Sequence, residues 1–384
     1  MGKLQLIATT VFGLEAVVAR ELKWLGYEDQ FIENGKVTFS GDLRTIAKTN
    51  IWLRSAERVL IKLGEFNAST FEELFCGTKD IPWEDWLPMD ANFPVEAKSI
   101  DSKLFSISDC QAIVKKAIVE RLKTKYKCSW FSESGSRYKV GVFILKDRVT
   151  LTIDTSGVGL HKRGYRKLVG VAPIKETIAS AILHISYWKE DRALIDPFCG
   201  TGTFPIEACM MALNIAPGLN RDFDAEKWGN IPESIWKEER ELAKSVIKND
   251  LDVRISGVDI DEDAISLARY HAKLAGVEDK IHLQRMSMRD ISSRYKYGSI
   301  VCNPPYGERI GEQNELKRLY KDMGKIFRKF DTWSYYIISS MQNFEKLFGA
   351  KANKKRKLYN GRIQCNLYQY FGEKPQKKLS KERG

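Results

Sequence analysis

Two short stretches of the sequence set polar residues beside glycine or proline in an order that could do chemistry. In the first, LIDPFCGTGT at 194–203, an apolar run ends in Asp196, and a loop with Gly200 and Gly202 follows. An apolar pattern with helical spacing then begins at Phe204. A strand, a glycine turn and a helix in this order place backbone N–H groups at a helix start, where a nucleotide-like ligand can approach closely.

The second stretch, SIVCNPPYGER at 299–309, has a similar design. An apolar strand delivers Asn303, followed by two prolines, to its carboxyl end. Open α/β sheets bind ligands at the carboxyl ends of their strands, so both loops should open onto one crevice. We therefore predict that the two stretches together form an active site.

Two acidic residues further along the chain suggest what the glycine loop binds. A predicted strand at 254–260 ends at Asp259, and an acid there can accept hydrogen bonds from both hydroxyls of a ribose. Asp290 follows a predicted strand at 281–285 and suits an adenine amino group, with an exposed loop acid as the alternative. No second glycine fingerprint or basic residue after Asp259 signals a pyrophosphate or a ribose phosphate. S-adenosylmethionine, which has no phosphate, therefore fits better than NAD.

The sequence Asn303-Pro304-Pro305-Tyr306 has a sharper chemical meaning, although a rigid turn is the simpler alternative. The prolines lock the backbone and lack N–H donors, so nearby carbonyls are free acceptors. The Asn303 side-chain oxygen and the Pro304 carbonyl can both accept from one planar NH2 group, which orients the nitrogen lone pair toward an electrophilic methyl group. Tyr306 offers a face on which a flipped base can stack. This chemistry needs neither a metal nor a strong general base.

The order of predicted elements separates two regions. Helices and strands alternate from residue 174 onward, and a hairpin turning at Asn360-Gly361 ends the pattern. We predict an α/β fold there, a doubly wound and mostly parallel sheet with an antiparallel edge, after an α+β region over the first 155 residues. In the second region we expect strands at 192–196, 254–260, 281–285, 299–302 and 334–339, and helices at 174–188, 203–213, 233–249, 261–275 and 314–329.

Basic charge is concentrated in two places on a chain whose net charge is +12. Residues 351–384 hold eleven lysines and arginines against two glutamates, and the glycine-rich segment 157–173 is also basic. Clustered basic charge suits a polyanion such as nucleic acid, whereas a solubilising tail is the alternative for the last dozen residues. His161 lies in the segment 157–173. A lone histidine beside lysine and arginine is more often a phosphate neighbour than a catalytic base. The residues that we expect to contact RNA are Lys162, Arg163, Tyr165, Arg166 and Arg309.

The composition restricts the class of protein. Of the 384 residues, 43% are hydrophobic and 29% are charged, as in an ordinary soluble globular protein. No apolar run is long enough for a membrane span, and the N-terminus lacks the features of a signal peptide. The seven cysteines include no CxxC pair, which argues for a reducing cytoplasm and against a zinc site or disulfides. We expect Cys199 and Cys302 to be structural and not nucleophilic.

The combined motifs resemble the class I S-adenosylmethionine-dependent methyltransferases, and NPPY resembles the subset that methylates planar amino nitrogens. Residues 95–122 resemble the second half of a THUMP domain, an RNA-binding module. The strings LHKRGYRK (160–167), APIKETIASAIL (172–183), DPFCGTGTFPIEA and NPPYGERI resemble the YpsC/RlmL-type THUMP methyltransferases of bacteria. This resemblance covers nearly the whole chain.

The resemblance implies methylation of a guanine N2 amine in 23S ribosomal RNA, with no metal and no obligate protein partner. It implies a ferredoxin-like region (1–55), a THUMP domain (56–156), a basic hinge (157–173), a methyltransferase domain (174–372) and a disordered basic tail (373–384). Asn303 to Tyr306 would hold the guanine amino group. The expected cofactor-binding residues are Lys175, Glu176, Asp196, Phe198, Gly200, Gly202, Thr203, Asp259, Ile260, Asp290 and Asn303.

Three other functions stay open on the sequence alone. Relatives that act on tRNA make a transfer RNA an alternative target. A DNA adenine-N6 methyltransferase would share NPPY, but it would carry a target-recognition domain in place of the THUMP-like region. A non-catalytic RNA-binding assembly factor would be free to lose Asp196, Gly200, Gly202 and NPPY, which are all present.

Overall fold

The computed structural model describes residues 3–166, 174–306, 313–361 and 363–374. The chain forms two compact units, each assembled from separate segments. The first unit consists of Met1–Thr10, Val18–His161 and Pro217–Ser245. The second unit consists of Val11–Val17, Lys162–Ala216 and Val246–Gly384.

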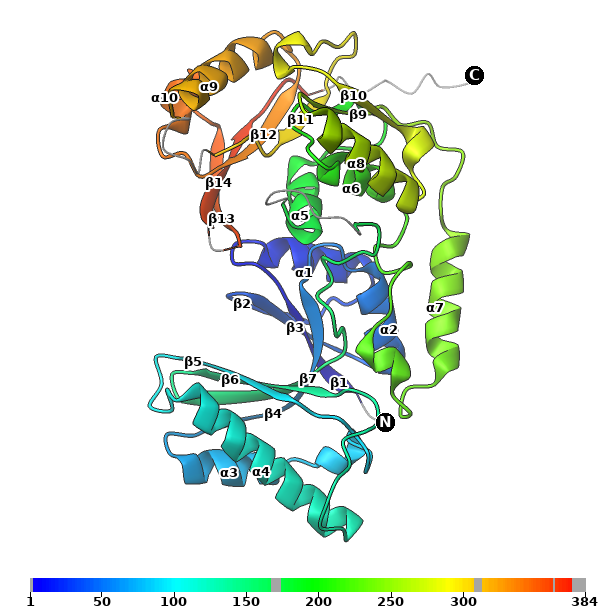
Figure 1. Ribbon diagram of the computed structural model, residues 1–384, viewed down its shortest axis with the longest axis vertical. Coiled ribbons are helices and arrows are strands. Elements are labelled where there is room, and N and C mark those ends of the chain that lie inside the picture. Colours follow the sequence, from blue (N-terminus) through cyan, green and yellow to red (C-terminus); the bar gives the residue numbers. More distant parts are fainter. Residues whose placement is uncertain (1–2, 167–173, 307–312, 362, 375–384) are drawn as a thin grey trace, which may run out of the picture. The chain divides into compact units, whose positions relative to one another are not determined.

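One seven-stranded sheet, with strand order β2-β3-β1-β4-β7-β6-β5, forms the centre of the first unit (Figure 1). Its pairs are antiparallel except β5 with β6, which run parallel. Burial alternates along β5 and β6, because successive side chains point to opposite faces. The strands are β1 (Leu4–Thr9), β2 (Gln30–Glu33), β3 (Lys36–Gly41), β4 (Arg58–Asn67), β5 (Val95–Ile100), β6 (Lys139–Leu145) and β7 (Arg148–Asp154).

Local hydrogen bonds define the start of one helix and one hairpin turn in the first unit. Asp42 caps α2, since its carboxylate accepts from the Thr45 backbone N–H at 2.8 Å and the Thr45 hydroxyl accepts from the Asp42 N–H at 3.0 Å. The turn between β6 and β7 has positive φ angles at Lys146 and Asp147, as a tight hairpin requires. The helices are α2 (Leu43–Trp52), α3 (Phe71–Lys79) and α4 (Ile107–Tyr126), while α1 (Glu15–Trp24) begins in the second unit's segment and continues in the first.

The segment Pro217–Ser245 belongs to the first unit, although it lies between elements of the second. Its helix α7 (Glu233–Ser245) packs on α2, where Arg44 pairs with Glu239 at 2.9 Å. The indole N–H of Trp228 also donates to the Arg137 carbonyl at 2.8 Å. Helix–strand alternation placed this helix with the second region, whereas the helix that it packs on, α2, belongs to the first unit and is distant in sequence.

A second seven-stranded sheet, with strand order β10-β9-β8-β11-β12-β14-β13, forms the centre of the second unit. The strands from β10 to β12 are parallel, and β13 and β14 add an antiparallel hairpin in which Asn360 pairs with Ile363 and Gly361 lies in the turn. The predicted doubly wound sheet and its antiparallel edge are confirmed. The strands are β8 (Leu194–Asp196), β9 (Ile255–Asp259), β10 (Ile281–Arg285), β11 (Ser299–Cys302), β12 (Ser334–Ser339), β13 (Lys354–Asn360) and β14 (Ile363–Tyr370).

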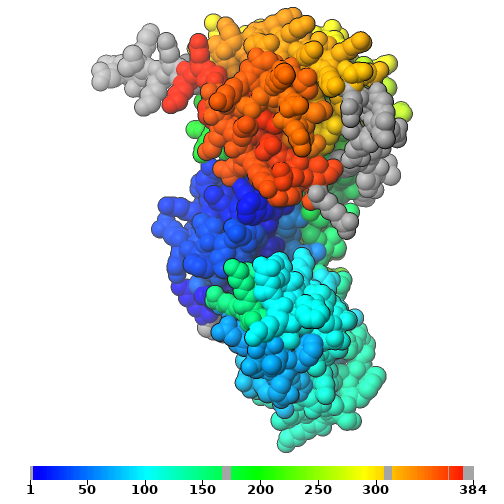
Figure 2. Space-filling view, turned by 90° about the vertical axis from the view of Figure 1, so that its left-hand side faces the viewer, coloured from blue at the N-terminus to red at the C-terminus, as the bar shows by residue number. Residues whose placement is uncertain are grey.

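Helices cover both faces of this sheet (Figure 1). On one face lie α5 (Glu176–Ser186), α6 (Thr203–Ala212) and α8 (Glu262–Leu274). On the other, α9 (Gln313–Phe327) and α10 (Phe344–Phe348) enclose an aromatic core with Tyr320, Phe327 and Trp333. The part of this unit drawn in orange and red, which includes α9, α10 and the hairpin of β13 and β14, forms much of the surface shown in Figure 2.

The order of the strands brings the two predicted loops together. Strand β8 lies between β9 and β11. The strands that follow β8 in sequence are therefore added first on one side of it (β9, β10) and then on the other (β11, β12). Such a switch point opens a crevice at the carboxyl ends of the strands. Asp196 ends β8, Asp259 ends β9, and Asn303 follows β11 directly, so these three residues meet at one edge of the sheet.

Candidate active site

The glycine loop begins at a buried carboxylate and ends at a helix start. Asp196 is only 1% exposed, and its carboxylate accepts from the Phe198 N–H at 3.1 Å. Gly202 has φ +87° and stands before α6 as its N-cap, and a Cβ on it would lie 3.1 Å from the Cβ of Ala268. A glycine is required at 202 for both reasons. Gly200, with φ +48°, has open space where a Cβ would be, so a ligand can approach its backbone closely.

Asp259 is tied to the same loop. Its carboxylate accepts from the Gly200 N–H at 2.8 Å and from the Asp261 N–H at 3.1 Å. Burial raises the pKa of Asp196 well above its usual range, and the nearby charge of Asp259 raises it further. Two acids thus lie at neighbouring strand ends, and Ile260 beside them is 69% exposed. Asp290 ends a short 3₁₀ turn, Met288–Asp290, after the next strand and is exposed.

Tyr320 of α9 holds the loop after β11 in place. The Tyr320 hydroxyl donates to the Pro305 carbonyl at 2.8 Å and lies 3.2 Å from the Ser339 hydroxyl. Pro304 is buried, Asn303 is half-buried and Pro305 is exposed. These contacts fix the backbone of the loop and thereby the position of Asn303, which directly follows β11 next to β8.

Tyr306 occupies an unexpected position. Its hydroxyl donates to the Oδ1 of Asn303, the oxygen that the sequence assigned to a substrate amine. The ring is half-buried, and burial raises the pKa of Tyr306, with Cys365 adding to the shift. In this structure the Asn303 oxygen therefore already accepts a hydrogen bond, from the Tyr306 hydroxyl.

Two of the RNA contacts predicted at 162–166, Arg163 and Tyr165, are buried instead of exposed. Arg163 is 3% exposed and pairs with the buried Glu207, the Arg163 Nε lying 3.4 Å from the Glu207 Oε1. Tyr165, also 3% exposed, donates its hydroxyl to the same carboxylate at 3.1 Å. A buried carboxylate attracts cations strongly, and this one lies on α6, far along the chain from its partners. The glutamate in the otherwise apolar run TFPIEACMMA was the sequence signal for this pairing.

Arg166 also points inward. One guanidinium nitrogen, Nη1, lies 3.3 Å from the Oε1 of Glu176, and the other, Nη2, donates to the Thr203 hydroxyl. Its side chain is 12% exposed, and that of Glu176 is 4% exposed. Burial raises the pKa of Glu176, while the positive charge of Arg166 opposes that shift. Of the five residues expected to contact RNA, Lys162 is exposed and Arg309 lies outside the described residues.

The residues at the glycine loop fit the cofactor that the sequence predicted. The Nε of Arg166 and the hydroxyl of Thr201 are buried without a hydrogen-bond partner among the described residues. Asp259 can accept more hydrogen bonds than its two backbone donors supply. Lys175 stands half-buried at the N-cap of α5. The Arg166 Nε, the Thr201 hydroxyl and the remaining acceptor capacity of Asp259, beside an open glycine backbone, suit a polar ligand with a hydroxylated sugar.

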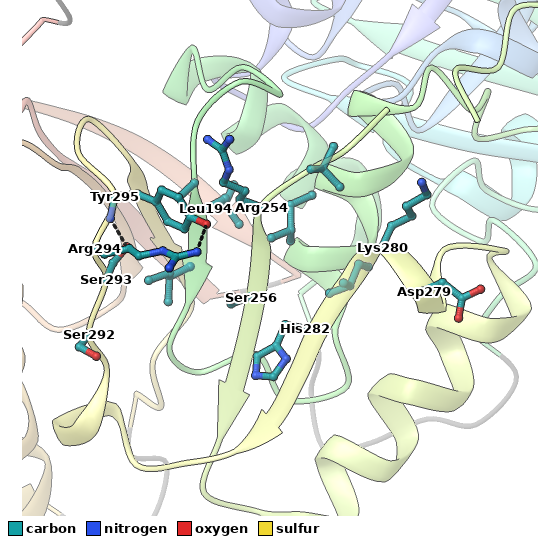
Figure 3. A pocket seen from close by; sticks show the side chains of 15 residues that line it. Leu194, Arg254, Ser256, Asp279, Lys280, His282, Ser292, Ser293, Arg294 and Tyr295 are labelled. Carbon is teal, nitrogen blue, oxygen red and sulfur yellow. Dashed lines mark hydrogen bonds between the residues drawn. The ribbon is translucent and has the colours of Figure 1, made fainter. Parts of the chain in front are cut away.

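One hollow of the second unit lies elsewhere. It encloses about 540 Å³ and is lined by the first residues of β8, β9 and β10, together with the loop at 292–295 (Figure 3). Arg294 donates to the Tyr295 hydroxyl at 3.3 Å there, opposite the strands that carry Ser256 and His282. The amino ends of parallel strands lie at the opposite edge from the carboxyl ends, so this hollow is separate from the candidate site.

Within the described ranges, no group of three or more His, Cys, Asp or Glu side chains could hold a metal ion. No helix in these ranges has both the length and the apolar character to cross a membrane. Cys199 and Cys302 are buried, and burial raises the pKa of each thiol well above its usual range. Neither thiol is therefore an accessible nucleophile, as the sequence predicted.

Three family models match the chain. The model described as "RMKL-like, methyltransferase domain" matches residues 163–369. The "RlmL ferredoxin-like domain" matches residues 5–60, and the "THUMP domain" matches residues 68–154.

Curated relatives match over nearly the whole chain. "Putative RNA methyltransferase YpsC" from Bacillus subtilis is 46% identical over 381 residues, which cover 98% of this chain and 99% of that protein. "Ribosomal RNA large subunit methyltransferase K/L" from Psychromonas ingrahamii is 34% identical over 94% of this chain, but the match spans only 49% of that longer protein.

Solved structures also match over nearly the whole chain. A structure described as a "predicted N6-adenine-specific DNA methylase" from Listeria monocytogenes is 49% identical, with a TM-score of 0.93 and 97% of each chain covered. "SMU.472, a putative methyltransferase complexed with SAH" is 44% identical, with a TM-score of 0.92, over 98% of this chain and 100% of that one. TrmN from Thermus thermophilus, 18% identical with a TM-score of 0.70 over 96% of this chain and 100% of that one, shares the fold.

Proposed function

We propose that this chain methylates the exocyclic N2 amine of a guanine in RNA. The chain belongs to the RMKL-like family of S-adenosylmethionine-dependent RNA methyltransferases, and the proposal starts from that membership. The observation that carries the proposal is the position of Asn303 and Pro304 at the carboxyl end of β11, next to the glycine loop after β8.

The acceptors at this loop suit a planar amine. An exocyclic NH2 group can donate one proton to the Asn303 side-chain oxygen and the other to the Pro304 carbonyl. Both donations draw the amine toward a pyramidal shape and direct its lone pair out of the ring plane. The cofactor, when bound, supplies a methyl group on a positively charged sulfur. The amine nitrogen bonds to the methyl carbon as the carbon–sulfur bond breaks, and the surplus proton passes to solvent.

Tyr306 must exchange partners in this mechanism. Its hydroxyl donates to the Asn303 oxygen, so an incoming amine replaces one donor with another. The acceptor is thereby kept hydrogen-bonded when no substrate is bound, which avoids the free-energy cost of an unsatisfied buried oxygen. Once released, the Tyr306 ring can stack on the extruded base.

For the cofactor we propose the division of roles that the motifs imply. Asp259 accepts from the ribose hydroxyls, and the exposed Ile260 packs against the adenine, with Asp290 at its amino group. The glycine loop and the start of α6 border the remainder of the cofactor through Asp196, Phe198, Gly200, Gly202 and Thr203.

Two features favour ribosomal RNA over DNA. The THUMP model matches residues 68–154, and THUMP domains bind RNA. Relatives that match 94% of this chain are named for the large ribosomal subunit. We therefore place 23S ribosomal RNA first and transfer RNA second. Adenine in DNA, the target in the name of the Listeria protein, comes third. Intact cofactor and target loops argue against a non-catalytic assembly factor.

Mass spectrometry of nucleosides tests the proposal. Ribosomal and transfer RNA are purified separately from a strain that lacks the gene, and N2-methylguanosine is quantified in each. We expect a loss in the 23S fraction that returns when the wild-type gene, but not the Asn303→Ala variant, is restored. An unchanged amount in both fractions would contradict the guanine assignment, and a loss of N6-methyladenine from DNA would support the competing one.

A further inference from the structure

We propose that Phe12, Tyr359 and Lys357 form a platform for unpaired nucleotides of the RNA substrate, next to the nucleotide that is methylated. In this platform Phe12 supplies a ring for stacking, Tyr359 supports that ring, and Lys357 pairs with the phosphate backbone. All three residues belong to the second unit. The inference rests on the proposed function, in which the substrate is an RNA with an extruded base.

The hairpin of β13 and β14 extends beyond the sheet at the edge where the candidate site lies. Strand β12 ends at Ser339, which pairs with Asn366 of β14. Residues 358–365 therefore continue past the carboxyl end of β12. Cys365, in this part of the hairpin, adds to the raised pKa of Tyr306, so the hairpin lies next to the target loop. An RNA whose target base reaches that loop passes beside the hairpin.

The turn before α1 holds Phe12 against this hairpin (Figure 1). The Gly13 carbonyl accepts from the Nη1 of Arg356 at 2.7 Å. Gly13 has φ +89°, and a Cβ on it would lie 2.7 Å from the Lys357 carbonyl oxygen, so only glycine allows this close approach. The backbone is thus fixed directly beside Phe12, whose ring centre lies 6.5 Å from that of Tyr359 at an interplanar angle of 72°.

This aromatic pair is open to solvent and lies beside positive charge. Phe12 is 47% exposed, and Tyr359 is half-buried. The Nζ of Lys357 lies 5.5 Å from the centre of the Tyr359 ring. Lys357 and Lys354 are both exposed, in the basic sequence KKRK at 354–357. Stacking rings beside exposed cations are typical of surfaces that bind single-stranded nucleic acid, because bases and phosphates are engaged together.

An unpaired strand suits this surface. A base that is extruded for methylation leaves its neighbours without one stacking partner, and an exposed ring replaces that partner. The alternative role for Phe12 is to cover β13, the last strand of the sheet, against pairing with another chain. Covering an edge needs only apolar bulk, whereas stacking needs an aromatic ring, so the two roles predict different results for the same substitution.

Two assays on the full chain test the platform. Fluorescence anisotropy measures binding to a labelled oligouridine at several salt concentrations. Radiolabelled S-adenosylmethionine measures methyl transfer to 23S RNA from a strain that lacks the gene. Phe12→Leu keeps the apolar bulk but removes the ring, and we expect both oligouridine affinity and kcat/KM for RNA to fall about 5- to 100-fold. The Kd for S-adenosylhomocysteine should stay within about twofold of wild type, because Phe12 serves the RNA.

Three companion variants sharpen the test. Phe12→Tyr keeps the ring and should behave like wild type. Lys357→Gln should weaken oligouridine binding a few-fold and reduce the salt slope by about one, as for one phosphate contact. Tyr295→Leu is the matched control, because Tyr295 is also exposed and lies beside two cations, with Arg254 4.7 Å and Arg294 5.3 Å from its ring centre, but at the amino ends of the strands. It should change neither RNA binding nor methyl transfer.

Each outcome decides for or against the platform. Unchanged oligouridine binding in Phe12→Leu would overturn it, as would equal losses in Phe12→Leu and Tyr295→Leu. A matching loss of affinity for S-adenosylhomocysteine would assign Phe12 to packing alone and overturn it as well. If Phe12→Leu does not fold, the salt slope of Lys357→Gln decides. A wild-type chain that binds oligouridine through Phe12 but transfers no methyl group to 23S RNA would instead contradict the proposed target and support the platform.

Discussion

The two halves of the candidate site differ in what occupies their acceptors. On the cofactor side, backbone N–H groups of Gly200 and Asp261 hold the Asp259 carboxylate, and these donors cannot leave. On the target side, the Asn303 oxygen is held by the Tyr306 hydroxyl, which belongs to a side chain that can rotate away. The first half is arranged in advance for its ligand, whereas the second must exchange a partner. We therefore expect cofactor binding to be independent of RNA, and RNA binding to require a change at Tyr306.

The largest effect should come from Asn303. Replacing it with Ala removes one of the two acceptors for the target amine and should lower kcat by about 100- to 1,000-fold, as the loss of one transition-state hydrogen bond does in other enzymes. The Kd for S-adenosylhomocysteine should not change, because the residue serves the target half. Parallel calorimetry and single-turnover methylation measure both, and comparable losses in the two would abolish the distinction between the halves.

Asp259→Ala should produce the opposite pattern. The affinity for S-adenosylhomocysteine should fall about 10- to 100-fold, since a charged acceptor for the ribose hydroxyls is lost. The affinity for 5′-methylthioadenosine should fall equally, because that probe keeps the ribose. Asp290→Ala, at the exposed turn, serves as the companion variant and should have a smaller effect. A selective loss for S-adenosylhomocysteine alone would place Asp259 at the amino-acid end of the ligand.

Tyr306 can be dissected with two substitutions. Tyr306→Phe removes the hydroxyl that occupies the Asn303 oxygen but keeps the ring, so KM for RNA should stay the same or fall. Tyr306→Ala removes the stacking face as well, and kcat/KM should drop by about 5- to 100-fold, the range expected for one base–aromatic contact. Steady-state kinetics at saturating cofactor distinguish these outcomes. A large loss in Tyr306→Phe would show that the hydroxyl acts during catalysis and not only in the unoccupied site.

Lys162 should give the smallest effect. Its side chain is exposed, and Lys162→Gln should weaken RNA binding a few-fold and reduce the salt slope by about one, as for one phosphate contact. Cofactor affinity should not change. Lys296→Gln, at an exposed lysine next to Tyr295 of the hollow in Figure 3, is the matched control. If both variants change the slope equally, the effect comes from net charge and not from a defined contact.

Local patterns in the sequence were sufficient for most of the fold and for the position of the site. Asp196, Asp259 and Asn303 each follow an apolar strand directly, so their strand-end positions depend only on neighbouring residues and on the rule for open sheets. The hairpin that turns after Asn360 is equally local.

Predictions that depended on distant partners failed. Arg163 and Arg166 lie in a basic stretch of sequence that is typical of an exposed patch. In the structure they instead pair with Glu207 and Glu176, and only the folded chain shows that these glutamates are close. The packing of α7 on α2 is likewise a contact between segments far apart in sequence. The hydrogen bond between Tyr306 and Asn303 depends on a side-chain rotamer, which a motif does not specify.

The segment Pro217–Ser245 has a consequence for the synthesis of the protein. Because it completes the first unit, that unit cannot close until residue 245 has left the ribosome, by which time α5, β8 and α6 of the second unit have also been made. Domains that are continuous in sequence usually fold one after another during translation. Here the first unit can close only after part of the second unit has emerged. The emerging chain therefore keeps the apolar surface that Trp228 and Trp236 later cover exposed for longer, and this nascent stage is the one most in need of chaperones.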